Sequence, residues 1–112
     1  MQDLAALAEE HLARARIATH GRSAHLIVHD GALRQSVIAL TSGSALDEHT
    51  TPPAASLQVL HGHVRLTSNS GNKELKAGQL CEIPKERHGL LALEDSAVLL
   101  TAVTAVSQDP PG

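Results

Sequence analysis

The residues of this chain best suited to chemistry are two histidines, His49 and His88, in segments punctuated by glycine and proline. A neutral imidazole binds divalent transition metals and can act as a general base near neutral pH. If the first segment is a strand, Asp47 and Thr51 share a face with His49, because alternate side chains of a strand point the same way. The pair therefore predicts either a weak metal site or the polar end of a binding pocket.

The glycines and the proline around these histidines follow a fixed spacing. Five residues separate Gly43 from His49, and Gly62 follows in the same frame. Five residues also separate Gly78 from Pro84, with His88 shortly after it. Over roughly residues 33 to 105, this arrangement resembles the two signature motifs of the cupin superfamily. The resemblance implies an all-β fold, the RmlC-like double-sheet antiparallel β-barrel, here with one N-terminal α-helix.

Cupin metal sites usually combine three histidines with one glutamate. Carried over by position, the first histidine is His49, the second falls on Thr51 and the glutamate falls on Ala55. The third is His88, which arrives one residue early and follows Glu86, where the motif has glycine. If a tighter corner absorbs this offset, His88 points inward and faces His49 across the barrel. The resemblance thus leaves two metal ligands, His49 and His88. We expect no tightly bound cofactor, with a labile divalent metal as the alternative.

The strands that carry these positions predict a largely aliphatic pocket. Side chains at alternate positions share a face, which groups Ala55 with Leu57 and Val59, and His88 with Leu90. The strand 33–40 should add one polar group, either Arg34 or Gln35. The predicted pocket consists of His49, Thr51, Ala55, Leu57, Val59, His88, Leu90 and Gln35. Such an interior suits a small, partly apolar ligand, or it is a filled core that binds nothing.

Three other reactive side chains, His61, His63 and Cys81, are predicted to have no role in a functional site. His61 and His63 flank Gly62 in a hairpin, so we expect both to be exposed to solvent. Cys81 has no basic neighbour in its own segment to lower its pKa, which predicts a buried structural thiol.

The pattern of apolar residues predicts one helix followed by short strands. Residues 3–18 read as a helix capped by Asp3, with Glu10 and Arg14 spaced as an i, i+4 ion pair. The following segments alternate and are separated by turn residues, as in a sandwich or barrel. The expected strands are 25–29, 33–40, 46–50, 56–60, 64–67, 80–83, 89–93 and 97–106, with Glu74 and Leu75 leading to the turn at Gly78. We expect the helix in residues 1–21 to pack on the barrel or on a dimer partner, with the barrel in 22–107 and a disordered tail in 108–112.

The amino-acid composition limits the kinds of partner that the chain can bind. The chain has 112 residues, 42% of them hydrophobic, and a formal net charge of −3, which gives no basic surface for nucleic acid. It contains no Phe, Tyr or Trp, so only imidazoles could stack on bases, which argues against a nucleic-acid partner, and the core must be aliphatic. The first fifteen residues hold no long apolar run, and we expect no membrane span.

The single cysteine suits a reducing cytoplasm. Because aliphatic side chains bury less area than aromatic ones, we expect a homodimer.

Three functions remain open at this point. The chain is a metal-free module that binds or senses a small molecule, a metal enzyme such as an oxygenase or isomerase built on His49 and His88, or a structural dimer with a packed barrel. Similarity to a fold does not choose among them.

Overall fold

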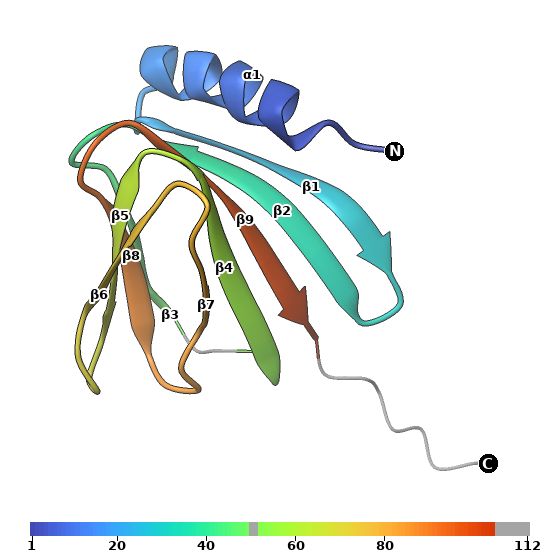
Figure 1. Cartoon of the computed structure of the whole chain (residues 1–112), viewed down its shortest axis with the longest axis vertical. Coiled ribbons are helices and arrows are strands. Elements are labelled where there is room, and N and C mark those ends of the chain that lie inside the picture. The colour runs from blue at the N-terminus through green and yellow to red at the C-terminus, as the bar shows by residue number, and fades with distance from the viewer. Residues whose placement is uncertain (50–51, 105–112) are drawn as a thin grey trace.

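The computed structural model describes residues 1–49 and 52–104 of the chain and shows one helix lying over a two-sheet β structure (Figure 1). Helix α1 (Leu4–Ile17) begins at Asp3, whose carboxylate accepts a hydrogen bond from the Ala6 N–H at 3.1 Å. The expected i, i+4 pair also forms, with Arg14 Nη2 3.0 Å from Glu10 Oε1. The prediction of a capped helix over residues 3–18 is confirmed.

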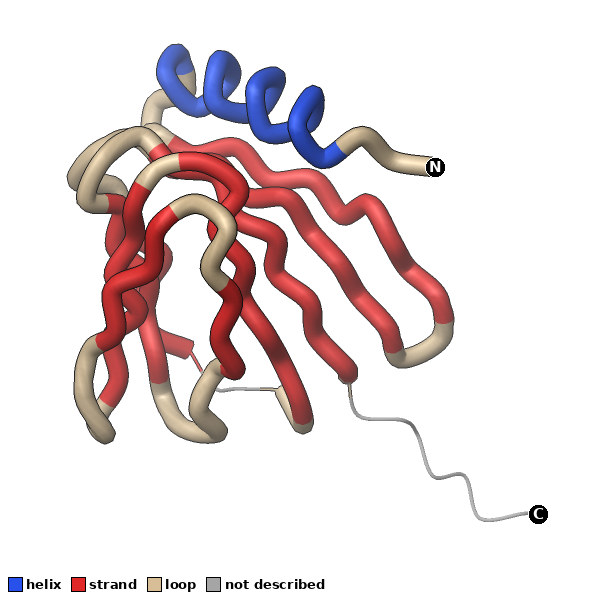
Figure 2. Tube along the Cα trace, in the orientation of Figure 1, coloured by secondary structure: helices blue, strands red, loops and turns tan. Residues whose placement is uncertain are grey.

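Nine antiparallel strands follow the helix in the described part of the chain. They are β1 (Arg22–Asp30), β2 (Leu33–Leu40), β3 (Ala45–His49), β4 (Ala54–His61), β5 (His63–Ser68), β6 (Lys73–Lys76), β7 (Leu80–Glu82), β8 (His88–Ala92) and β9 (Ser96–Val103). One sheet has the order β1-β2-β9-β4-β7 and the other the order β3-β8-β5-β6. Figure 2 shows the two sheets facing each other, with α1 on the outer side of the larger one. The predicted strands are thus present with ends shifted by a few residues, and β6 is a strand that was not predicted from the sequence.

Side-chain alternation divides the apolar residues of the larger sheet between two layers. The inner layer, between the sheets, includes Ile38, Leu40, Leu57 and Val59, with Leu66 and Leu90 from the smaller sheet. On the outer face, Ala8, Leu12 and Ala15 of α1 pack against Ala39, Ala97 and Leu60. The expectation that the N-terminal helix packs on the barrel agrees with this second layer.

The double-sheet antiparallel fold is confirmed, but the barrel is not closed. Within the described residues, no strand pairing joins the five-stranded sheet to the four-stranded one. The helix α1 is neither long nor apolar enough to span a membrane, and the described part of the chain has no other helix. The predicted tail, 108–112, lies outside the described residues.

Glycines take the turns that the spacing predicted. Gly43, Gly62 and Gly78 have φ angles of 85°, 90° and 88°, in the left-handed region that side chains rarely adopt. Gly62 joins β4 to β5, and Gly78 precedes β7. Their spacing therefore fixes where three of the chain reversals occur.

Candidate functional site

The two candidate histidines lie on adjacent strands of the smaller sheet. The backbone of His49 in β3 is paired with that of His88 in β8, beyond an irregularity in the register after Leu46. The expectation that His88 faces His49 across the barrel is wrong, because β3 and β8 are neighbours in one sheet. The pairing brings the two residues side by side, although the side chain of His49 lies outside the described part of the structure.

His88 is held in one orientation by the backbone. Its side chain is buried, and its Nδ1 lies 3.1 Å from the carbonyl oxygen of Glu86. A carbonyl only accepts hydrogen bonds, so Nδ1 must carry the proton, and Nε2 is the nitrogen that keeps the lone pair in the neutral ring. The predicted inward placement of His88 is confirmed.

Glu86 anchors the turn between β7 and β8 by a hydrogen bond to another turn. Its carboxylate accepts a hydrogen bond from the Ser70 N–H at 2.7 Å, across to the β5–β6 turn. Hydrogen bonds from the Ser70 side chain and backbone hold the pKa of Glu86 below its usual range. The residue that replaces the motif glycine therefore fixes the corner from which His88 enters the interior.

The described interior beside His88 is almost completely filled. A cavity of about 20 Å³ remains there, enough for about one water molecule. Its lining consists of His88 and seven aliphatic residues: Ile38, Leu46, Leu57, Leu66, Ile83, Leu90 and Leu100. Among the described residues, the inner layer thus presents a single polar side chain to this cavity.

A larger hollow of about 390 Å³ lies where β4, β7 and β9 run side by side. Its walls are Ala54, Ala55, Ser56, Glu82, Ile83, Lys85, Thr101 and Val103. Ile83 also lines the small cavity beside His88, so one side chain separates the two spaces. We call this larger hollow the β4–β9 hollow. It combines an aliphatic surface with a carboxylate, an ammonium group and two hydroxyls.

Most of the predicted pocket residues do share the inner face. Leu57, Val59 and Leu90 are buried in the core, and Ala55 packs against it at the end of β4. Thr51 lies outside the described residues. The grouping is correct because β4 alternates regularly between Ala55 and Val59.

Gln35 is not part of this group. It pairs with Thr101 in β9, and its Nε2 donates a hydrogen bond to Thr101 Oγ1 at 3.0 Å. Since Ile38 of the same strand faces the inner core, Gln35, an odd number of positions away, faces the outer side. There it borders a groove formed with Leu4, Val28 and other residues near the helix. Arg34 is an even number of positions from Ile38 and therefore lies on the inner face.

Sequence reasoning missed the polar residues of the β4–β9 hollow. Ser56 pairs with Thr101 on one side and with Glu82 on the other, which sets three polar side chains in one row across the sheet. Lys85 follows Pro84 at the corner beyond β7. Strand alternation in the sequence already places Ser56 on the face opposite to Ala55 and Leu57. That Ser56 lies between Glu82 and Thr101, however, follows only from the pairing of β4 with β7 and β9.

Two other expectations concern reactive side chains. His61 is exposed as expected, whereas His63 is half-buried, with Nε2 2.9 Å from Glu74 Oε1 of the neighbouring strand β6. The expectation of a solvated His63 is wrong because β6 covers it. Cys81 is only partly buried, not fully buried as expected, but it packs against the inner core and burial raises the pKa of its thiol, which agrees with a structural role.

The described donors do not match a cupin metal site. Ala55 has no ligand atom at the carboxylate position, and the described residues contain no group of three or more His, Cys, Asp or Glu side chains arranged to hold an ion. His88 supplies one imidazole with its Nε2 lone pair correctly set. The four-ligand set of the motif therefore does not fit these residues, and we derive no chemical step through a metal.

Comparison with solved structures identifies the fold. A conserved protein of unknown function from Streptococcus pyogenes superposes with a TM-score of 0.72 at 23% identity, over 80% of each chain. A cupin superfamily protein from Desulfitobacterium hafniense gives 0.70 at 12% identity, over 75% of this chain and 78% of that one. The chain has the cupin fold.

The cupin fold is shared by proteins of different roles. A salicylate 1,2-dioxygenase from Pseudaminobacter salicylatoxidans gives a TM-score of 0.72 at 14% identity, over 88% of this chain and 33% of that one. No protein-family model matches the sequence, and no curated protein matches it. The resemblance to cupins read from the glycine and histidine spacing is confirmed at the level of fold.

Proposed function

We propose that this cupin is a small-molecule-binding or sensing module whose ligand occupies the β4–β9 hollow. The observation that carries the proposal is the contrast between the two spaces that Ile83 separates. The space beside His88 has about 20 Å³, whereas the hollow has about 390 Å³, within the range of small-molecule sites. Of these two spaces, only the β4–β9 hollow has room for a small molecule.

The lining of the hollow defines the class of ligand. Ala54, Ala55 and Val103 offer an aliphatic wall, and Lys85 supplies a positive charge beside the hydroxyls of Ser56 and Thr101. An ammonium group together with hydroxyl groups suits a carboxylate or another small anion, which would have to bind away from the Glu82 carboxylate that also lines the hollow. We expect a small metabolite with one anionic group and a short apolar body.

A thermal-shift screen against small carboxylic acids tests this proposal. Lys85→Gln should abolish the shift given by a binding acid, because the anion loses its counter-charge. Lys76→Gln, on the exposed strand β6, is the matched control and should keep the full shift. A hit that raises the melting temperature equally in both variants would place the ligand elsewhere and refute the assignment.

A metal-dependent enzyme, an oxygenase or isomerase using His49 and His88, is the second candidate. It is supported by the backbone pairing of the two histidines and by the Glu86 carbonyl, which sets His88 Nε2 as the ligand nitrogen. Elemental analysis of untagged protein distinguishes the candidates. Near one equivalent of a transition metal per chain, lost in His88→Ala, would favour the enzyme. A substoichiometric content unchanged by His88→Ala would favour the binding module.

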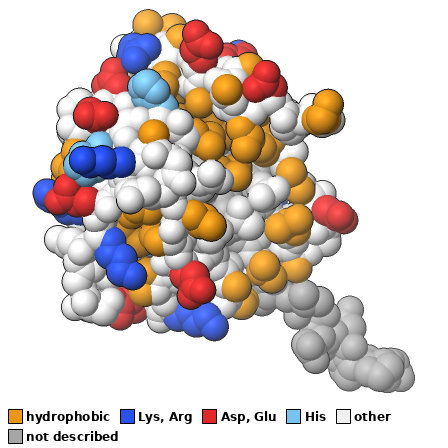
Figure 3. Space-filling model, viewed as in Figure 1, with side chains coloured by type: hydrophobic (Ala, Val, Ile, Leu, Met, Phe, Trp, Pro, Cys, Tyr) orange, Lys and Arg blue, Asp and Glu red, His pale blue; other side chains and the backbone are white. Residues whose placement is uncertain are grey.

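We also propose that the chain forms a homodimer in the cytoplasm. Apolar side chains gather on the outer face of the larger sheet beside the helix (Figure 3). Leu33 and Val103, at the ends of β2 and β9, are more than a third exposed, so a second copy would cover apolar area that now faces water. Sedimentation equilibrium at tens of micromolar should give twice the chain mass, and a monomer under those conditions would exclude a stable dimer.

A further inference from the structure

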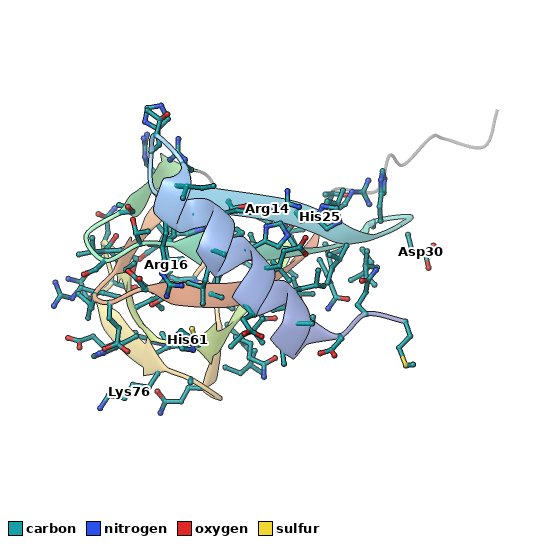
Figure 4. The ribbon with its side chains drawn as sticks, turned by 90° about the horizontal axis from the view of Figure 1, so that it is seen from above. Arg14, Arg16, His25, Asp30, His61 and Lys76 are labelled. Atoms are coloured by element: carbon teal, nitrogen blue, oxygen red, sulfur yellow. The ribbon has the colours of Figure 1, made fainter. Side chains whose placement is uncertain are left out.

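A buried imidazole lies between helix α1 and strand β1. His11 is only 5% exposed, and its Nδ1 lies 2.7 Å from Ser23 Oγ of β1. Its ring stacks on that of His25, with centroids 5.7 Å apart and an angle of 18° between the planes. Figure 4, seen from above, shows His25 beside the helix that crosses the sheet. An imidazole of the helix, His11, thus contacts two side chains of β1, Ser23 and His25.

This contact disfavours a positive charge on His11. Burial lowers the pKa of His11, and the charges of Arg14 and His25 lower it further, while Glu10 raises it. Glu10 is also engaged by Arg14, with 3.0 Å between Oε1 and Nη2. The groups that α1 meets on β2 and β9, Ala39 and Ala97, are neutral and apolar.

The rest of the contact between helix and sheet is made of small side chains. Ala8 and Ala15 supply much of the helix face, and Ala39 and Ala97 lie opposite them, with Leu12 and Leu60 as the larger contributors. Alanine buries little apolar area, so hydrophobic adhesion along this interface is modest. A charge placed within the interface therefore weighs heavily against it.

The far end of the helix is fastened by a separate ion pair. Arg16 Nε lies 3.0 Å from Asp95 Oδ2 in the β8–β9 turn, and Asp95 Oδ1 accepts a hydrogen bond from the Ser42 N–H at 2.9 Å. A carboxylate titrates well below the range of an imidazole. Mild acid therefore acts on the His11 contact first and leaves the Asp95 tether in place.

We propose that α1 is a pH-sensitive cover, which the His11–His25 stack holds on the outer face of the larger sheet at neutral pH and releases on mild acidification. Release uncovers the apolar strip of Ala39, Leu60 and Ala97. The direction follows from linkage, because a released His11 regains an ordinary imidazole pKa near 6.5. Docking is complete above that value and weakens as the pH falls toward the lower pKa of docked His11.

Hydrogen exchange measured by mass spectrometry at pH 7.5 and pH 5.0, corrected for intrinsic rates, tests this proposal. Each pKa unit between docked and released His11 changes the docking equilibrium about tenfold. We expect the α1 amides to lose protection at pH 5.0 relative to pH 7.5, while β4 and β9 keep theirs. His11→Asn removes the titration and retains a polar group near Ser23, so its α1 protection should not change with pH. His20→Asn, an exposed histidine just beyond the helix, should behave as wild type.

A second variant keeps the test decisive if His11→Asn weakens docking at every pH. His25→Gln removes the imidazole that stacks on His11 while His11 itself remains, so docking loses a holding contact and the pH at which α1 is released should move upward. Unchanged α1 protection in the wild type at pH 5.0 would overturn the proposal. So would a release pH unaffected by His25→Gln, or a parallel loss of protection in β4 and β9.

Discussion

Gly62 offers a sharp test of how the fold is built, because a second glycine serves as its control. A Cβ atom at Gly62 would lie 2.4 Å from the carbonyl oxygen of Asp95 and 2.4 Å from Ser96 Oγ. Ser96 is fully buried, and its hydroxyl accepts from the His63 N–H at 3.0 Å and lies 2.7 Å from the Glu94 carbonyl. Gly62→Ala must therefore displace both the backbone of the β8–β9 turn and the Ser96 side chain that ties this turn to β5.

The expected loss of unfolding free energy in Gly62→Ala has two contributions. Holding an alanine in the left-handed region costs about 1–2 kcal/mol. Displacing Ser96 threatens two buried hydrogen bonds at about 1 kcal/mol each. We expect Gly62→Ala to lower the free energy of unfolding by about 3–4 kcal/mol, a large part of the roughly 5–15 kcal/mol typical of a domain. Gly78 has nearly the same φ, 88°, but a Cβ atom there would meet nothing within 4 Å, so Gly78→Ala should lose only about 1–2 kcal/mol.

Urea unfolding followed by far-UV circular dichroism measures both variants, since the chain has no Trp or Tyr to report by fluorescence. The quantity that decides is the difference between them, about 2 kcal/mol. Equal losses in Gly62→Ala and Gly78→Ala would mean that backbone strain alone matters and that the contact with Ser96 gives way freely.

Two further predictions concern the core and the helix tether. Leu57→Ala, at a core position only 2% exposed, should cost about 2–5 kcal/mol in the same urea assay, while Leu80→Ala, 65% exposed, should cost less than about 0.5 kcal/mol. The Ser42 N–H and Arg16 hold the pKa of Asp95 below its usual range, so its contribution is present above the ordinary carboxyl pKa and is lost as the pH falls through the lowered value. Thermal melts from about pH 6 to about pH 2 should therefore show a shallower loss of stability for Asp95→Asn than for the wild type, and parallel curves would contradict this role.

The turns and strands could be read from the sequence because glycine and proline mark local backbone conformations. Gly43, Gly62 and Gly78 all occupy positions with positive φ, which a sequence pattern can indicate without knowledge of the partners. The inner face of β4 was also readable, since Ala55, Leu57 and Val59 are aliphatic and the alternating Ser56 and Gln58 are polar.

The faces of β2 could not be read in this way. Both Val37 and Ile38 are buried, one on each side of the strand, because α1 covers the outer face and the second sheet covers the inner one. A strand buried on both faces loses its alternation, so the sequence left Arg34 and Gln35 undecided. Only pairing with β9, which joins Gln35 to Thr101, fixed the orientation.

The candidate site failed to emerge from the sequence for a related reason. Its residues are separated along the chain but adjacent across the sheet: Ser56 stands between Glu82 and Thr101 only because β4 lies between β7 and β9. The relation of His49 to His88 likewise depends on the pairing of β3 with β8. Which of these residues become neighbours is decided by strand pairing between distant parts of the chain, and no local sequence motif indicates it.

The distribution of contacts along the strands supports placing the function at one end of the molecule. At the β8–β9 turn, Ser96 and Asp95 bind backbone groups of two other segments, through His63 in β5 and Ser42 between β2 and β3, and Ser96 also bonds Glu94 within the turn. At the opposite ends of β4 and β9, the β4–β9 hollow is bordered by short side chains that leave space. A rigid scaffold that positions a site with room for a ligand is the usual division in ligand-binding folds. Substitutions at the β8–β9 turn should therefore change stability, and those at Lys85 or Glu82 should change binding while leaving stability almost unaltered.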